Sequence, residues 1–159
     1  MTDALLFALT LAAALGCGLI AGVFFAFSAF VMGALARLPA AHGIAAMQSI
    51  NVVVINPAFL GVFFGTAVLC IVLIVAALIT WGETGAICLL VGALLYLVGT
   101  IVVTMACNVP RNNALAAVAP DSDAGAGLWP RYVREWTAWN HVRAAAALLA
   151  AASFTMALR

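Results

Sequence analysis

The sequence predicts an all-α integral membrane protein, a four-helix bundle that forms a single four-transmembrane domain over residues 1–159. Two compositional observations support this fold: 68% of the residues are hydrophobic and only 7% are charged. A water-soluble chain of this length needs roughly 25% charged residues and cannot hide so much apolar surface in one small core. Lipid is therefore the expected solvent for most of the chain.

The third observation is the spacing of the apolar stretches. A transmembrane helix needs about 20 consecutive apolar residues, and charge-free stretches of at least that length predict three spans at about 4–32, 57–80 and 85–107. A fourth stretch at about 136–158 is rich in alanine and carries its polar residues at its start. We predict that it is the fourth span, because the rest of it is uncharged up to the terminal arginine.

Three connections join the predicted spans. Residues 33–56 contain a helix-compatible stretch and predict a short interfacial helix between spans 1 and 2. The segment Trp81-Gly82-Glu83-Thr84 predicts a tight hairpin, which makes spans 2 and 3 antiparallel neighbours. Residues 108–135 combine glycine, proline and aspartate and predict a polar loop between spans 3 and 4.

The arginines predict an orientation. Arg37, Arg111, Arg131 and Arg134 fall in connections on one side of the predicted bundle. Positive residues in short loops are retained on the cytoplasmic side. We therefore expect both termini outside the cytoplasm, in a bacterial inner (plasma) membrane.

Composition and motifs exclude several classes of function. The net charge is +1 and the arginines form no stripe that could follow a phosphate backbone, so no nucleic-acid partner is expected. The two histidines and four cysteines are spread along the chain and predict no metal site. No glycine-rich nucleotide loop, no nucleophile elbow and no intramembrane acidic residue for ion-coupled transport is present.

Two pairs of glycines form GxxxG patterns, Gly18 with Gly22 and Gly61 with Gly65. Small residues let helices approach closely in lipid, so these pairs predict close crossings. The pattern leaves open whether the crossing helices belong to one chain or to two subunits of a homo-oligomer.

Polar residues gather near the arginine-rich ends of the predicted spans and could converge on one site. Ionisable groups inside a membrane are costly, which makes His141 and Arg143 the first functional candidates. Two structural alternatives stay open: Arg143 could reach the interface while His141 bonds a carbonyl, and asparagines beside prolines could cap helices. The remaining candidates for substrate binding are Asn51, Asn56, Asn108, Asn112, Trp136, Trp139 and Asn140.

Helical geometry relates these candidates to one another. At about 100° per residue, Tyr132, Trp136, Trp139, Asn140 and Arg143 share a stripe of roughly 80°. Within that stripe Arg143 could lie over Trp139 in a cation–π contact. The side chain at position 141 projects from a different side of the same helix.

Four motifs resemble those of the DUF1772, or anthrone oxygenase-like, membrane proteins, over essentially the whole chain. The motifs are Ala21-Gly22-Val23-Phe24-Phe25-Ala26-Phe27-Ser28, Met47-Gln48-Ser49-Ile50-Asn51 with Asn56-Pro57 and Phe59, Asn108-Val109-Pro110-Arg111-Asn112, and Trp136-Thr137-Ala138-Trp139-Asn140-His141-Val142-Arg143. The resemblance implies a four-helix membrane protein and, for fungal members, oxygenation of anthrones to anthraquinones.

Two functions follow as hypotheses. The first is a cofactor-independent oxygenase that acts on a lipophilic aromatic substrate, anthrone-like or quinol-like, with molecular oxygen as cosubstrate. Under it His141 would act as the general base, Arg143 with Asn140, Asn108 and Asn112 would stabilise an oxyanion, and the tryptophans would stack on the rings. The second is a noncatalytic binding module or accessory subunit. In either case the expected partners are membrane lipid and a lipophilic small molecule.

Overall fold

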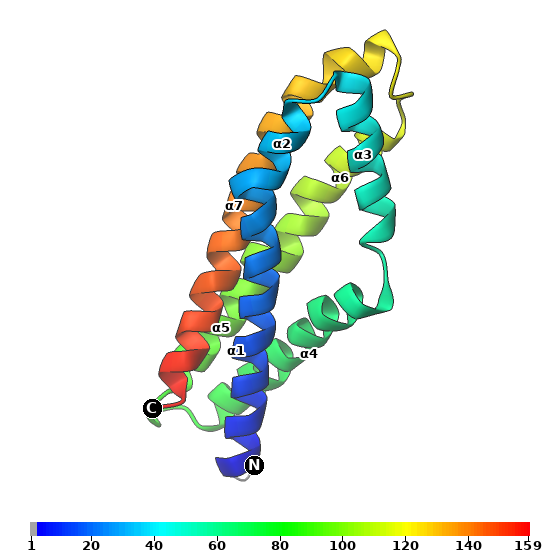
Figure 1. Cartoon of the computed structure of the whole chain (residues 1–159). Coiled ribbons are helices and arrows are strands. Elements are labelled where there is room, and N and C mark those ends of the chain that lie inside the picture. The colour runs from blue at the N-terminus through cyan, green and yellow to red at the C-terminus, as the bar shows by residue number, and fades with distance from the viewer. Residues whose placement is uncertain (1–2) are drawn as a thin grey trace.

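The computed structural model describes residues 3–159, and their regular structure is entirely helical. They form five helical segments, and the two ends of the chain lie at the same end of the elongated molecule (Figure 1). Short stretches of wider π-helix interrupt the first and fourth segments without ending them. In chain order the segments are α1 (Asp3–Ala26) with η1 (Phe27–Val31) and α2 (Met32–Ala36); α3 (Ala40–Val53); α4 (Pro57–Ile79); α5 (Ala86–Tyr96) with η2 (Leu97–Val102), η3 (Thr104–Asn108) and α6 (Val109–Ala116); and α7 (Asp123–Ala157).

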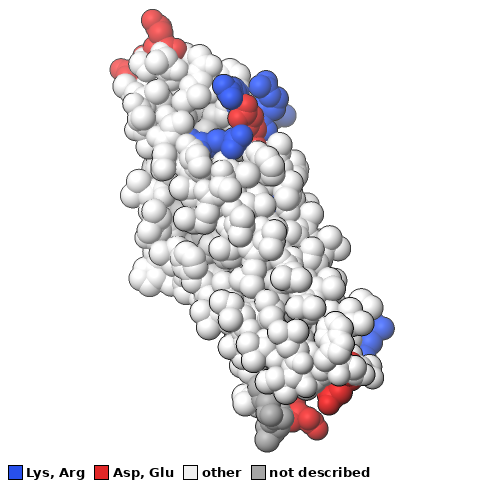
Figure 2. Space-filling model, turned by 180° about the vertical axis from the view of Figure 1, so that it is seen from behind, with Lys and Arg blue, Asp and Glu red and all other residues white. Residues whose placement is uncertain are grey.

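Three of the helical segments, Asp3–Ala36, Pro57–Ile79 and Ala86–Ala116, are long and apolar enough to cross a membrane. They confirm that three of the predicted spans are helices of membrane length. The charged side chains visible in Figure 2 lie near the two ends of the molecule, with a broad uncharged band between them. The remaining long helix, α7, is less apolar, and its crossing of the membrane stays a prediction.

Local sequence signals set where several helices begin. At the start of α4 the Asn56 side chain accepts a hydrogen bond from the Phe59 main-chain N–H at 3.0 Å, and Pro57 occupies the first turn. Ser122 caps α7 in the same way, through the N–H of Gly125 at 3.0 Å. The connection between α4 and α5 is residues 80–85, and within it Gly82 has a φ of 97° that other residues rarely adopt.

The predicted polar loop between the third and fourth helices is much shorter than expected. The third long helix continues to Ala116 and α7 already begins at Asp123, so the connection is residues 117–122. Pro110 lies directly after the π-helical stretch η3 within this continuous helix, and Pro130 lies inside α7. Leu115, Trp129 and Tyr132 of this stretch are buried in one apolar cluster, and this packing overrides the local preference for a loop.

A 14-residue helix, α3, occupies the connection between the first two spans, where a shorter one was expected. It packs against α7, α2 and α6. Their contact forms a second apolar cluster beside the main core, built from Met32, Ile44, Met47, Leu115, Trp129, Tyr132 and Trp136. The Gln48 amide ties α3 to the end of α6 by donating to the carbonyl oxygens of residues 115 and 118 at 2.9 and 3.0 Å.

The closest helix crossings do not use the GxxxG glycines. A Cβ atom added to Gly18, Gly22, Gly61 or Gly65 would meet no other atom within 4 Å. Of the two alternatives left open, a close crossing within the chain is therefore not formed at these glycines, and a contact between subunits stays untested. The tight contacts are instead Gly16 against Thr66, Gly92 against Phe154 and Gly99 against Ala146.

Candidate functional site

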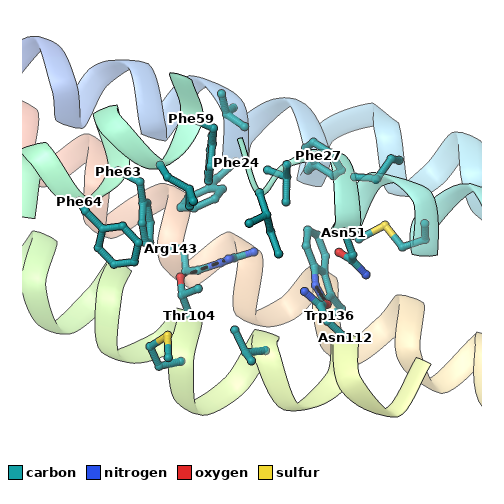
Figure 3. A pocket seen from close by; sticks show the side chains of 18 residues that line it. Phe24, Phe27, Asn51, Phe59, Phe63, Phe64, Thr104, Asn112, Trp136 and Arg143 are labelled. Atoms are coloured by element: carbon teal, nitrogen blue, oxygen red, sulfur yellow. Dashed lines mark hydrogen bonds between the residues drawn. The ribbon is translucent and has the colours of Figure 1, made fainter. Parts of the chain in front are cut away.

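A cavity of about 220 Å³ lies between the helices at the level of the π-helical stretches. Side chains from five segments surround it, as Figure 3 shows for the labelled residues. Aromatic and aliphatic groups dominate the wall, and the polar groups are few. The lining comprises Val23, Phe24, Phe27, Met47, Ile50, Asn51, Val54, Ile55, Phe59, Leu60, Phe63, Phe64, Thr104, Met105, Val109, Asn112, Trp136 and Arg143.

The guanidinium of Arg143 is the only charged group in this lining, and its residue is 5% exposed. Its Nη2 donates to Asn140 Oδ1 at 2.6 Å and its Nη1 donates to Thr104 Oγ1 at 3.3 Å. A guanidinium has five N–H donors, and in the part of the chain that the structure describes Nε has no partner. Arg143 therefore offers unused donors.

No carboxylate compensates the charge of Arg143 among residues 3–159, where both ion pairs involve Glu135. Two aromatic faces lie against it instead: its Cζ is 4.2 Å from the Phe24 ring centroid and 5.1 Å from that of Trp136. Cation–π contacts offset only part of the cost of burying a cation. The arrangement suits an anionic or strongly polarised oxygen as the missing partner.

The expected contact between Arg143 and Trp139 is not formed. Trp139 is 37% exposed and lies outside the cavity, while Trp136, one turn earlier, supplies the ring. The stripe of α7 is narrower than expected, because Tyr132, Trp136, Asn140 and Arg143 are buried and Trp139 is not.

Asn140 is fully buried and does not line the cavity. Its Nδ2 donates to the carbonyl oxygen of Phe24 and to Ser28 Oγ, each at 2.6 Å, while its Oδ1 receives the Arg143 guanidinium. These bonds attach the cation to the first helix where that helix enters its π-helical stretch. Asn140 therefore positions Arg143.

Asn112 lines the cavity and has a fixed orientation. Its Oδ1 accepts hydrogen bonds from Tyr132 Oη at 3.0 Å and Trp136 Nε1 at 2.8 Å. Because both bonds go to the oxygen, the Nδ2 group must point the other way. The same contacts hold the Trp136 ring, which is the one that lies over Arg143.

The other residues predicted to form the site do not all lie at the cavity. Asn51 lines the cavity, whereas Asn56 caps α4 outside it and the buried Asn108 donates to the main-chain oxygen of Trp136 at 3.2 Å. His141 is exposed on the opposite face of α7, where it borders a shallow groove with Gly18 and Gly22. The two residues predicted to be catalytic, His141 and Arg143, are therefore not brought together.

Sequence reasoning missed several wall residues. Thr104 and Met105 lie in an apolar stretch that carries no separate signal, and Phe59 and Phe63 resemble lipid-facing phenylalanines in the sequence. These two rings are stacked, with centroids 5.7 Å apart and an angle of 15° between planes. Their one-turn spacing was the only available indication that they share a face.

At the polar end of the molecule Glu135 joins two arginines. Arg131 approaches its carboxylate at 2.7 Å and Arg111 at 3.0 Å, which links α6 to α7. The hydrogen bond from Arg131, followed by that from Arg111, holds the pKa of the Glu135 carboxyl below its usual range. This partly exposed network is distinct from the cavity and does not reach Arg143.

The fold and the cavity define a class: an all-helical protein with membrane-length apolar helices around a small, mostly apolar pocket with one buried cation. The protein family described as anthrone oxygenase matches residues 59–153, which is more than half of the 159 residues. The chain therefore belongs to this family. The match includes Thr104, Asn112, Trp136 and Arg143. No curated protein and no solved structure matches the chain.

Proposed function

We propose that this protein is a membrane-embedded, cofactor-independent oxygenase that acts on a lipophilic aromatic carbon acid of the anthrone type. The observation that carries the proposal is the guanidinium of Arg143, which is buried without a carboxylate partner among residues 3–159 in the wall of a mostly apolar cavity. A cation in such a site favours the ionised form of a bound acid and stabilises charge that develops on oxygen.

The proposed chemistry needs a binding site for one oxyanion. Loss of a proton from the CH₂ carbon of an anthrone gives an aromatic oxyanion, and the Arg143 guanidinium binds that oxygen. Molecular oxygen then forms a bond to the ionised carbon, and protonation gives a hydroperoxide. Loss of water, which takes the second hydrogen from the same carbon, leaves a carbonyl group. The substrate carbon is oxidised, and the oxygen molecule is reduced to one carbonyl oxygen and one water.

The substrate proton needs an acceptor, and none of the residues that line the cavity is acidic or a histidine. We assign this role to water, with Arg143 lowering the pKa of the bound substrate. Phe24 and Trp136 would lie against the planar rings, and the Nδ2 group of Asn112 supplies a neutral hydrogen-bond donor.

The membrane arrangement is part of the proposal. α7 packs along α1 and α5, two segments of the membrane-length helices, which favours a fourth crossing by α7. Four crossings agree with the two termini at one end (Figure 1). Arg111, Arg131 and Arg134 would then lie on the cytoplasmic side of a bacterial inner membrane, and both termini would lie on its outer side.

The direct test is turnover. Purified protein in detergent would be mixed with an anthrone in air, and anthraquinone formation and oxygen uptake would be followed against a control without protein. We expect a rate above the control with equal amounts of oxygen consumed and quinone formed. Saturable binding of the anthrone without turnover would assign the alternative function, a noncatalytic binding module.

Replacing His141 by alanine is expected to change turnover by less than about threefold, because this side chain is exposed on the far side of α7 from the cavity. Initial rates at saturating anthrone for the two proteins give the comparison. A loss of activity in this variant with the fold intact would restore His141 as the general base and remove water from that role.

A further inference from the structure

The residues at the opening of the cavity indicate which kind of ligand can enter it. Three residues of the lining are strongly exposed, Ile55 at 68%, Phe64 at 49% and Met105 at 58%, and all three are apolar. Phe64 belongs to α4 and Met105 to η3, inside two of the membrane-length helices. The cavity therefore opens through an apolar mouth on the side of the bundle.

The course of α4 explains this mouth. α4 packs mainly against α1 and α5, and in Figure 1 its N-terminal end diverges from the helix that contains η3 and α6. The mouth lies between these two helices, where the exposed lining side chains Phe64 and Met105 are apolar. Hydrocarbon chains of lipid are the medium in contact with such a surface.

The interior of the cavity, unlike its apolar mouth, carries polar groups. Arg143 and Trp136 are buried, and in Figure 3 Arg143 lies beside Thr104 while Trp136 lies beside Asn112. The volume of about 220 Å³ is below the roughly 300–1,000 Å³ that pockets for drug-sized ligands usually enclose. A compact oxygenated ring system fits this space, and anything attached to it must leave through the mouth.

We infer that the ligand is an amphipathic aromatic lipid, whose oxygenated aromatic head fills the cavity while an alkyl or isoprenoid chain passes between Phe64 and Met105 into the bilayer. The inference rests on the proposed function for the head and adds the chain. A chain that stays in hydrocarbon need not be extracted from the membrane, so the ligand can bind directly from lipid.

The test compares an anthrone with the same anthrone carrying a decyl chain, both radiolabelled, in binding to the full-length protein in lipid nanodiscs. The concentration of each compound is expressed relative to the lipid, so that a difference in how the two compounds partition into the nanodiscs does not affect the comparison. The variant Met105→Trp narrows the mouth at an exposed position. The matched control is Val98→Trp on the same helix, which is 56% exposed and outside the cavity lining.

We expect Met105→Trp to weaken binding of the decyl compound by about tenfold or more, and binding of the bare anthrone by less than about threefold, with Val98→Trp leaving both unchanged. Equal effects of Met105→Trp on the two compounds would overturn the inference while leaving the proposed function standing. Absence of saturable binding for both compounds would overturn the two together.

Discussion

Replacing Arg143 by glutamine is expected to lower anthrone turnover by about 100-fold or more, the usual effect of removing a donor that stabilises an oxyanion. Glutamine keeps a polar end group on a shorter side chain and loses the charge and most of the donors. Arg143→Lys should retain a fraction of the activity, because an ammonium keeps the charge without the planar fork that reaches both Asn140 and Thr104. Initial rates normalised to monodisperse protein give the comparison.

Loss of the fold would not explain that result, because the rates are normalised to monodisperse protein. Removing a buried cation without an acidic partner also relieves a desolvation cost, which offsets the lost hydrogen bonds to Asn140 and Thr104. Arg134→Gln is the matched control, since this arginine lies on the same helix but is exposed and outside the cavity. It should leave the rate unchanged. If Arg143→Gln kept more than half of the wild-type rate, the oxyanion role of Arg143 would be excluded.

Replacing Gly92 by leucine is expected to give the largest loss of stability. A Cβ atom at this position would lie 2.9 Å from Cε1 of Phe154, a ring that is fully buried between α5 and α7 and cannot move aside. Overpacking of this kind costs about 1–3 kcal/mol, which corresponds to a fall of roughly 2–12 °C in the unfolding temperature of a chain of this length. Thermal unfolding in detergent, followed by circular dichroism or by loss of the monodisperse peak, measures it.

Gly61→Leu is the matched control for Gly92→Leu. Gly61 is also a helical glycine, in α4, but a Cβ atom there meets nothing within 4 Å. Its replacement should change the stability by less than about 0.5 kcal/mol. An equal loss of stability in both variants would contradict the prediction that the contact of Gly92 with Phe154 causes the loss. It would also mean that Gly61 lies at a close crossing, for example between subunits.

The tests of Arg143 and His141 distinguish two mechanisms, one in which Arg143 binds the oxyanion of the ligand and one in which His141 acts as the general base. Both residues are ionisable and near one another in sequence, yet Arg143 is buried beside Phe24 and His141 is exposed on the groove of Gly18 and Gly22. A side chain can act on a ligand only if it reaches the ligand. The geometry favours Arg143 alone, with Asn140 as the residue that positions it.

Much of the fold is determined by local sequence. Apolar runs longer than a membrane is thick can only form helices in lipid, because every main-chain group must find a partner within its own segment. Three membrane-length helices follow from this. The hairpin at Gly82 and the cap at Asn56 also follow, since each depends on a few neighbouring residues. Helical periodicity likewise placed His141 and Arg143 on different sides of α7.

Only the tertiary structure decided the composition of the site. Phe24 from the first helix, Asn51 from α3, Thr104 from η3 and Arg143 from α7 meet around one cavity, although they are far apart in sequence. The extension of the third helix past Pro110 brought Asn112 to Trp136, which a loop would not have done. Periodicity gives the direction of a side chain from its own helix, but the neighbour in that direction depends on how the helices pack. For that reason the sequence determined the helices and the candidate cation, and the packing determined which residues surround it.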